Sequence, residues 1–329
     1  MIHTRAPWFG AICRMMRQRA LGSTGIEVSE VGLGTWGLSG DGYGTVSEAD
    51  QDRVIDRARR VGITLFETAD SYAHGGMEAR LGRLLAGDDA AHVVTKLGTD
   101  RQANVARKRF DATYLRGAFE RSRERLARAR LTAVLLHNPS VGAVERGDAS
   151  DLMEELAKTG QVQTWGVSAG NVAVARAAIR RGARVVQLAY NAFFERDLLE
   201  LSSEIREQRV GVLARSVLAY GLLAGLWSAD KEFAEGDHRG ERWTHDDLAL
   251  RIRQLDALRP AVGGGVPSLR AVALRFVLST ELVSSAVIGP RSILQLDQLV
   301  RERGSGPPYL APEKFDALRE RLREAGVVS

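Results

Sequence analysis

The sequence predicts an α/β fold: a (β/α)8 TIM barrel with an N-terminal β-hairpin closing its bottom and helices at its C-terminus. Eight short β-rich runs are each followed by a helical pattern, and such strict alternation implies a parallel sheet with right-handed crossovers. A chain of 329 residues also suits one barrel of this type. The alternative is an open doubly wound sheet, whose first turn would read Gly-x-Gly-x-x-Gly.

The first core strand gives that alternative only weak support. Residues 32–37 read Gly-Leu-Gly-Thr-Trp-Gly and fit the pattern. However, the bulky Trp36 lies inside it, and a Gly-rich loop follows instead of the helix that binds a pyrophosphate. We therefore expect the closed barrel.

The elements are justified in order by local signals. Ser23-Thr24-Gly25 between two short β-rich runs predicts a hairpin over residues 20–28, and a first core strand runs over 28–36. Helical spacing of Val54, Ile55, Ala58 and Val61 predicts a helix from residue 47 that ends at Gly62. Further strands are expected at residues 64–69, 92–97, 131–136, 164–167, 185–190, 211–216 and 284–288. Further helices are expected at residues 77–85, 111–129, 149–158, 172–181, 198–208, 268–279, 293–303 and 312–324.

The N-terminal residues differ from the rest of the chain. Residues 1–18 carry Arg5, Arg14 and Arg17 but no clean apolar stretch, so a secretory signal is not expected. We predict a disordered extension over 1–18 and a single barrel domain over 19–329. Met15 or Met16 is an alternative start, and a short mitochondrial-type leader is the other interpretation.

Composition limits the classes of partner. The single Cys13 excludes an internal disulfide framework and indicates a reducing compartment, so we expect a cytoplasmic protein. No apolar run approaches the roughly 18 residues that span a bilayer. The net charge is +5, but the arginines alternate with acidic residues along helices, which is typical of solvated helix faces. We therefore expect no membrane and no nucleic-acid partner, and either a monomer or a homo-oligomer.

Polar and reactive side chains cluster where the predicted strands end. Glu67 and Tyr72 follow the second core strand, and Lys96 and His137 follow the next two. In a barrel these ends meet at one face. A lysine and a histidine there are costly to bury unless a carboxylate is near, which makes simple packing a poor explanation of the set.

These residue types favour proton donation to a carbonyl oxygen. A phenol has a pKa of about 10 in water, and a neighbouring ammonium would lower the pKa of Tyr72 and make it a usable general acid. Glu67 would hold Lys96 charged and in place, and a neutral His137 could orient the carbonyl. Since no side chain here is redox-active, a hydride must come from a cofactor. No metal site is expected, because no His, Cys and Asp cluster has metal-ligand spacing.

Over roughly residues 19–325 the chain resembles the aldo-keto reductases. The motifs that carry the resemblance, in chain order, are Gly32-Leu33-Gly34-Thr35-Trp36, Phe66-x-Thr68-Ala69-x-x-Tyr72, Glu78-x-x-Leu81-Gly82, Thr95-Lys96, Leu136-His137, Gly166-Val167-Ser168, Gln187-x-x-Tyr190-Asn191, Gly221-Leu222-Leu223-x-Gly225 and Ile288-Gly289-x-Arg291-Ser292.

The resemblance implies a (β/α)8 barrel that uses NAD(P)H without a Rossmann domain and reduces an aldehyde or ketone. The family's tetrad of Asp, Tyr, Lys and His would fall on Glu67, Tyr72, Lys96 and His137. The Arg-Ser pair at 291–292 would meet the 2′-phosphate, which favours NADPH over NADH; an Arg-Ser pair opening a helix is also a sound phosphate site in itself. The cofactor residues implied are Gly34, Thr35, Trp36, Ser168, Gln187, Arg215, Ser216, Leu218, Gly221, Gly289, Arg291, Ser292 and Gln295.

Four residues depart from the family pattern. Glu67 stands in place of the tetrad aspartate, Ala169 in place of an Asn, Val217 in place of a Pro, and Leu299 in place of an Asn that often contacts adenine. The substrate is set by loops and is not readable from the residues. The alternatives to a carbonyl reductase are a cofactor-binding regulatory barrel with little turnover, a reductase of an imine, enone or sugar-nucleotide intermediate, and a barrel with unrelated chemistry.

Overall fold

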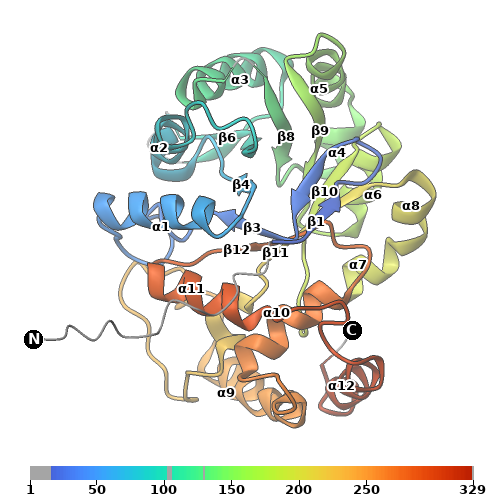
Figure 1. Ribbon diagram of the computed structural model, residues 1–329. Helices are drawn as coiled ribbons and strands as arrows, with labels where there is room; N and C mark the ends of the chain where they lie inside the picture. The colour runs from blue at the N-terminus through green and yellow to red at the C-terminus, as the bar shows by residue number, and fades with distance from the viewer. Residues whose placement is uncertain (1–15, 102–105, 129, 328–329) are drawn as a thin grey trace, which may run out of the picture.

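The computed structural model describes residues 16–101, 106–128 and 130–327. Within them, eight parallel strands close into a barrel whose order follows the chain from β3 to β12. Figure 1 shows these strands in the middle of the molecule with the helices around them. The predicted (β/α)8 fold is therefore confirmed. The barrel strands are β3 Val31–Gly34, β4 Leu65–Glu67, β5 His92–Leu97, β8 Leu131–His137, β9 Val162–Ser168, β10 Val185–Ala189, β11 Gly211–Arg215 and β12 Ser285–Ile288.

The helices lie close to their expected positions, with a few differences. The helix expected over 198–208 is broken at Leu201 into two. Two further helices were not expected: α4 is too short to show a period, and α9 buries only Leu248 and Gln254. The helices are α1 Glu48–Arg60, α2 Gly76–Leu84, α3 Ala112–Leu126, α4 Val141–Glu145, α5 Asp148–Lys158, α6 Val172–Arg180, α7 Arg196–Glu200, α8 Ser202–Gln208, α9 His245–Gln254, α10 Leu269–Ser279, α11 Ile293–Glu302 and α12 Pro312–Glu324.

The predicted hairpin closes the N-terminal end of the barrel. Its strands, β1 Gln18–Ala20 and β2 Glu27–Ser29, pair antiparallel. Leu21 and Val28 are fully buried and belong to one apolar cluster with side chains of the barrel interior, including Leu65. Gly22 has a φ of +59°, and a Cβ there would lie 2.3 Å from the backbone nitrogen of Gly211, so only glycine allows the turn to press this closely against the barrel.

The boundary expected at residue 18 falls inside the fold. Gln18 begins β1, and Met16 is buried in the main hydrophobic core. The rest of the expected extension, with Cys13, lies outside the described residues.

At the end of the barrel that the hairpin closes, the fully buried Glu30 accepts hydrogen bonds from Arg303 at 3.0 Å and from the hydroxyl of Tyr309. This ion pair fastens the C-terminal segment to the start of the barrel.

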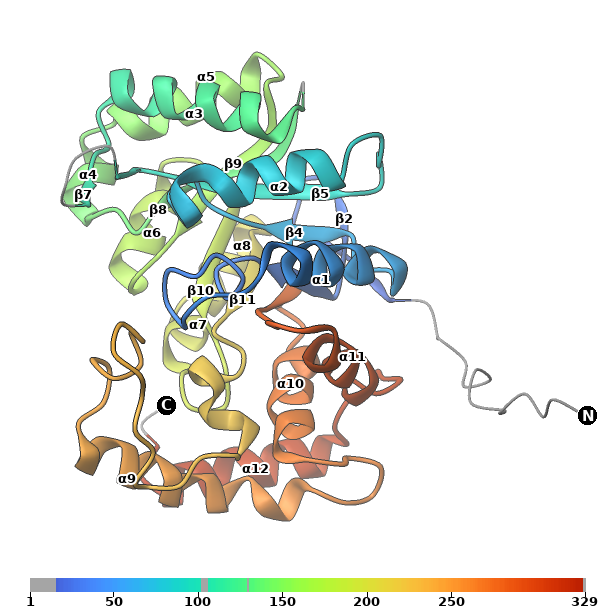
Figure 2. The same ribbon diagram turned by 90° about the vertical axis from the view of Figure 1, so that its left-hand side faces the viewer.

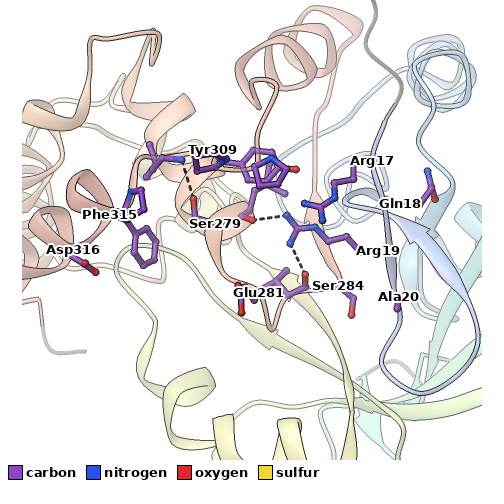
Figure 3. Close-up of a pocket in the computed structure, with 16 residues that line it drawn as sticks. Arg17, Gln18, Arg19, Ala20, Ser279, Glu281, Ser284, Tyr309, Phe315 and Asp316 are labelled. Carbon is purple, nitrogen blue, oxygen red and sulfur yellow. Dashed lines mark hydrogen bonds between the residues drawn. The ribbon is translucent and has the colours of Figure 1, made fainter.

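A cavity of about 770 Å³ lies at this closed end, between β1 and the C-terminal segment. Figure 3 shows Arg19 spanning it, with Tyr309 and Phe315 on the other wall. The guanidinium of Arg19 donates to the backbone oxygens of Leu278 and Val283 at 2.6 and 2.9 Å. The guanidinium of Arg19 therefore joins the hairpin to the end of α10 and to the segment that precedes β12.

The parallel register brings the carboxyl ends of the strands to the end of the barrel opposite the hairpin. Glu67 on β4 is opposite Val94 on β5, Lys96 is opposite Leu135 on β8, and His137 is opposite Ser168 on β9.

Figures 1 and 2 both show α9, α10 and α12 grouped on one side of the barrel. In the described residues no helix is long and apolar enough to cross a membrane.

Candidate active site

A buried ion pair forms the base of the site. Lys96 Nζ donates to Glu67 Oε1 and, at 2.8 Å, to the backbone oxygen of Thr68. The side chains of Lys96 and Glu67 are only 1% and 6% exposed. The longer glutamate side chain therefore still reaches the lysine. Gln187 Nε2 donates to the same carboxylate oxygen at 3.1 Å, a link that the sequence did not indicate.

Tyr72 and His137 lie next to this pair. Lys96 Nζ is 4.6 Å from the centroid of the Tyr72 ring. The rings of Tyr72 and His137 meet edge to face, with centroids 6.1 Å apart. The turn that carries Tyr72 is held by Asp41, whose Oδ2 accepts from the backbone nitrogen of Ala73 at 2.8 Å. A phenol, an ammonium and an imidazole at the ends of three neighbouring barrel strands, β4, β5 and β8, therefore converge.

Burial sets the protonation states of the three groups. It raises the pKa of Tyr72, and the positive charge of Arg215 opposes this rise. We expected a lowered pKa for this phenol, but removing a phenolate from water outweighs the attraction of nearby cations. Burial lowers the pKa of Lys96 and of His137, and neighbouring cations act in the same direction. At neutral pH Tyr72 therefore keeps its proton and His137 is neutral, whereas the ion pair with Glu67 favours the charged form of Lys96.

A short hairpin beside the site was not predicted. Its strands, β6 Thr99–Asp100 and β7 Arg107–Lys108, pair antiparallel. Lys108 Nζ donates to Thr99 Oγ1 at 2.7 Å and to the backbone oxygen of His137 at 2.8 Å. Strands of two residues leave no periodic pattern, so only the fold could reveal that Lys108 reaches the histidine.

Asp70 lies three residues after Glu67, and the charges that act on it are those of Glu78, Arg125 and Lys108. Its Oδ1 is buried and has no hydrogen-bond partner in the described part of the chain. Burial, followed by the negative charge of Glu78, raises the pKa of Asp70 to about 7, and Arg125 opposes the rise. This is a carboxyl group that the fold prefers to keep protonated.

Asp70→Asn should therefore stabilise the protein in neutral and alkaline solution. Between the unfolded-state pKa of about 3.9 and the folded value of about 7, the folded protein binds more protons at Asp70 than the unfolded chain does. Rising pH thus favours unfolding over this window. At pH 8 we expect a gain on the order of 2 to 4 kcal/mol in the free energy of unfolding, measured by denaturant titration. If the free energies of unfolding of the variant and the wild type changed in parallel with pH, the raised pKa of Asp70 would be contradicted.

Several cofactor candidates surround the ion pair. Ser168 ends β9 and is buried, and Gln187 on β10 leaves its Oε1 buried without a partner among the described residues. Arg215 ends β11 and donates to the backbone oxygen of Ala169 at 3.1 Å. Ser216 follows with a φ of 57°. Leu218 and Gly221 lie in the irregular turn after it, where Gly221 has a φ of 104°.

Gly34, Thr35 and Trp36 border the same face. A Cβ at Gly34 would lie 3.1 Å from Glu67 Oε2 and 2.8 Å from Val287, so a larger residue would disturb the ion pair. Thr35 donates its backbone N–H to the backbone oxygen of Glu67 at 2.9 Å, and its hydroxyl is buried without a partner among the described residues. These positions extend the site around the carboxylate.

A second group lies at the start of α11. Ser292 caps this helix by accepting from the backbone nitrogen of Gln295 at 3.2 Å, and Gln295 Oε1 accepts from the backbone nitrogen of Arg291 at 2.8 Å. Arg291 donates to the backbone oxygens of Gly44 and Thr45 at 3.0 and 3.2 Å. Its Nε is buried and lacks a partner among the described residues. A Cβ at Gly289 would meet nothing within 4 Å. Leu299, by contrast, is buried in the core.

An aromatic cluster joins the loop that follows β3 to the long segment that precedes α9. The ring of Trp36 lies 5.0 Å from Tyr43 and 4.6 Å from His238, and the backbone nitrogen of His238 donates to Gly42 at 3.1 Å. Arg239 sits 4.8 Å from the Tyr43 ring and is paired with Asp237. The sequence did not predict that these two segments meet.

Among the described residues no group of three His, Cys, Asp or Glu side chains could hold a metal ion. The polar groups of the site suit an organic cofactor. Buried donors and acceptors without partners, at Gln187, Thr35 and Arg291, match the amide, hydroxyl and phosphate groups of a nicotinamide dinucleotide.

Comparisons with known proteins agree with this geometry. Aldo-keto reductase YhdN of Bacillus subtilis is 26% identical over 296 residues, covering 86% of this chain and 88% of its own. The L-galactose dehydrogenase of Arabidopsis thaliana is 26% identical, covering 86% of both chains. The solved structure of the glycerol dehydrogenase AKR11B4 from Gluconobacter oxydans has the same fold, with a TM-score of 0.81 at 23% identity over 95% of this chain and 97% of that one. The sequence model of the Aldo/keto reductase family matches residues 30–303, and the chain therefore belongs to this family of oxidoreductases.

Proposed function

We propose that the protein is an NADPH-dependent carbonyl reductase in which Tyr72 donates the proton. The observation that carries this proposal is the convergence of Tyr72, Lys96 and His137 at the barrel mouth, with Lys96 held by the buried carboxylate of Glu67. A protonated phenol beside a fixed ammonium and a neutral imidazole is arranged to bind a carbonyl oxygen and protonate it.

The chain's own groups have distinct tasks in this reaction. NADPH, when bound, supplies the hydride that adds to the carbonyl carbon. As negative charge grows on the oxygen, Tyr72 transfers its phenolic proton to it, which gives the alcohol. Lys96 stabilises the phenolate that Tyr72 becomes, and His137 donates a hydrogen bond that positions the oxygen. Since Lys96 is almost wholly buried, its charge acts in a weakly screened environment.

The residues of the second group would bind the adenosine end of the cofactor. The start of α11 presents backbone N–H groups, the Ser292 hydroxyl and Arg291, and helix N-termini favour phosphate groups. The positive charge of Arg239 is close enough to lower the pKa of Arg291, after burial. Arg239 is itself paired with Asp237, so Arg291 is the cation that a phosphate would meet. Ser168 and Gln187 would contact the nicotinamide amide, and residues 215–221 the pyrophosphate.

Replacing Arg291 should change cofactor preference. We expect Arg291→Glu to raise the Kd for NADPH at least about 10-fold more than the Kd for NADH, because only NADPH carries the 2′-phosphate. Arg301→Glu, which changes an exposed arginine near the end of α11, is the control. Fluorescence titration of both cofactors measures the difference, and equal losses for the two would remove Arg291 from the phosphate site.

Turnover tests the proposal as a whole. Purified protein should oxidise NADPH steadily with members of an aldehyde and ketone panel. The assay should also be run with alcohols, because two of the similar proteins are named as dehydrogenases. Tight NADPH binding without turnover in either direction would favour the regulatory barrel instead. Failure to bind either nicotinamide cofactor would contradict both functions.

A further inference from the structure

The hairpin of β6 and β7 places the ammonium group of Lys108 next to His137. Thr99 and Lys108 are partners in the register of this hairpin. Lys108 Nζ donates to Thr99 Oγ1 at 2.7 Å and to the backbone oxygen of His137 at 2.8 Å. Thr99 Oγ1 in turn lies 3.4 Å from His137 Nδ1. The three residues form a chain of contacts that ends on one particular ring nitrogen.

The hydrogen-bonding groups of these residues favour one direction for this chain of contacts. A lysine ammonium only donates, whereas a threonine hydroxyl accepts at two lone pairs and donates one hydrogen. Because Lys108 fills one acceptor position of Thr99, the hydroxyl can still either donate to Nδ1 or accept from it, and the ammonium bound to its oxygen polarises the O–H bond and favours donation to Nδ1. An imidazole nitrogen that accepts such a hydrogen carries no proton of its own.

Electrostatics favours the same arrangement. The Nδ1 side of the ring faces the ammonium of Lys108 through Thr99, so a lone pair there is attracted and an N–H dipole is repelled. A second proton on the ring is also disfavoured, since burial and then the charges of Lys96, Lys108, Arg215 and Arg101 lower the pKa of His137. The ring is therefore neutral, and its one proton belongs on the far nitrogen.

We propose that Lys108 and Thr99 are positioning residues that hold neutral His137 in the tautomer carrying its proton on Nε2. This proposal rests on the function proposed above, because Nε2–H is then the donor that His137 offers to a substrate carbonyl. The sequence that follows β5 thus does more than shape a substrate loop. It sets which nitrogen of the histidine donates.

Nuclear magnetic resonance tests the tautomer without any turnover. In long-range proton–nitrogen spectra of the full-length, nitrogen-15-labelled protein, a His137→Gln sample identifies the His137 signals among the six histidines. We expect the wild-type Nδ1 to show the shift of an unprotonated nitrogen and Nε2 that of a protonated one. In Thr99→Val and Lys108→Met both shifts should move toward each other, and in Thr99→Ser they should stay. A protonated Nδ1 in the wild type, or unchanged shifts in both Thr99→Val and Lys108→Met, would overturn the proposal.

Kinetics with a neutral aldehyde then tests whether the tautomer matters. Thr99→Val and Lys108→Met should each lower kcat about 10-fold with little change in KM, less than the about 10²- to 10³-fold cost of deleting a transition-state donor outright. Arg107→Met, which removes a cation from the same strand but contacts Asp100 instead, should leave kcat unchanged. A change in KM alone, or an equal decrease of kcat in Arg107→Met, would count against a positioning role. A wild-type protein without reductase activity would contradict the proposed function, while the spectra would still decide the tautomer.

Discussion

Tyr72→Phe should lower kcat for carbonyl reduction by about 10²- to 10⁴-fold, the range that general acid catalysis contributes. The change removes one oxygen and keeps the ring that contacts Lys96 and His137. NADPH binding and the fold should therefore be unaffected. Stopped-flow measurement of hydride transfer, together with a fluorescence titration of NADPH, separates the chemical step from cofactor binding.

The matched control is Tyr190→Phe. Tyr190 is a buried tyrosine whose hydroxyl contacts Thr280 at 2.7 Å, and Thr280 is the residue that ends α10. We expect its kcat to equal that of the wild type. If Tyr72→Phe kept full turnover, another group would have to donate the proton, and the proposed mechanism would be wrong.

Lys96→Met should both abolish turnover and destabilise the fold by about 3 to 5 kcal/mol, because it leaves the buried Glu67 carboxylate without its cation. The double variant Glu67→Gln with Lys96→Met removes both charges and keeps the side-chain volumes similar. It should recover most of the stability and none of the activity. Denaturant midpoints and kcat for the four members of this double-mutant cycle give both results.

An exposed ion pair provides the comparison. Arg123 and Glu120 pair at 2.6 Å on α3 with their side chains 42% and 46% exposed, and Arg123→Met should change stability by less than about 1 kcal/mol. Recovery of turnover in the double variant would show that the Glu67–Lys96 pair is structural only. A small stability loss in Lys96→Met would mean that water reaches Glu67 once the lysine is gone.

Much of the fold was predictable because it follows from local pattern. Eight β-rich runs alternating with helices specify a parallel barrel, since each strand must be covered by the helix that follows it. The strand from His92 to Leu97 was predicted to the residue. The elements that were missed, α4, α9 and the hairpin of β6 and β7, are short or bury few side chains. The predicted cytoplasmic location rests on Cys13, which lies outside the described residues, and stays a prediction.

The residues of the candidate site were predictable for a different reason. Glu67, Lys96 and His137 are polar groups at the ends of apolar runs, and parallel strands carry such ends to one face. Their roles, and those of Arg291 and its neighbours, remain proposals. Their protonation states could not be read from residue types, because the pKa of Tyr72 depends on how completely the barrel removes the phenol from water.

The sequence by itself determined the barrel, the family and the face on which Glu67, Tyr72, Lys96 and His137 meet. Only the tertiary structure decided that Glu67 reaches Lys96 despite its extra methylene, that Gln187 shares this carboxylate, and that Lys108 stands behind His137. The physical reason is that periodicity reports which residues are buried along one element. The atoms that a side chain then touches depend on the register between strands and on loops brought together by barrel closure.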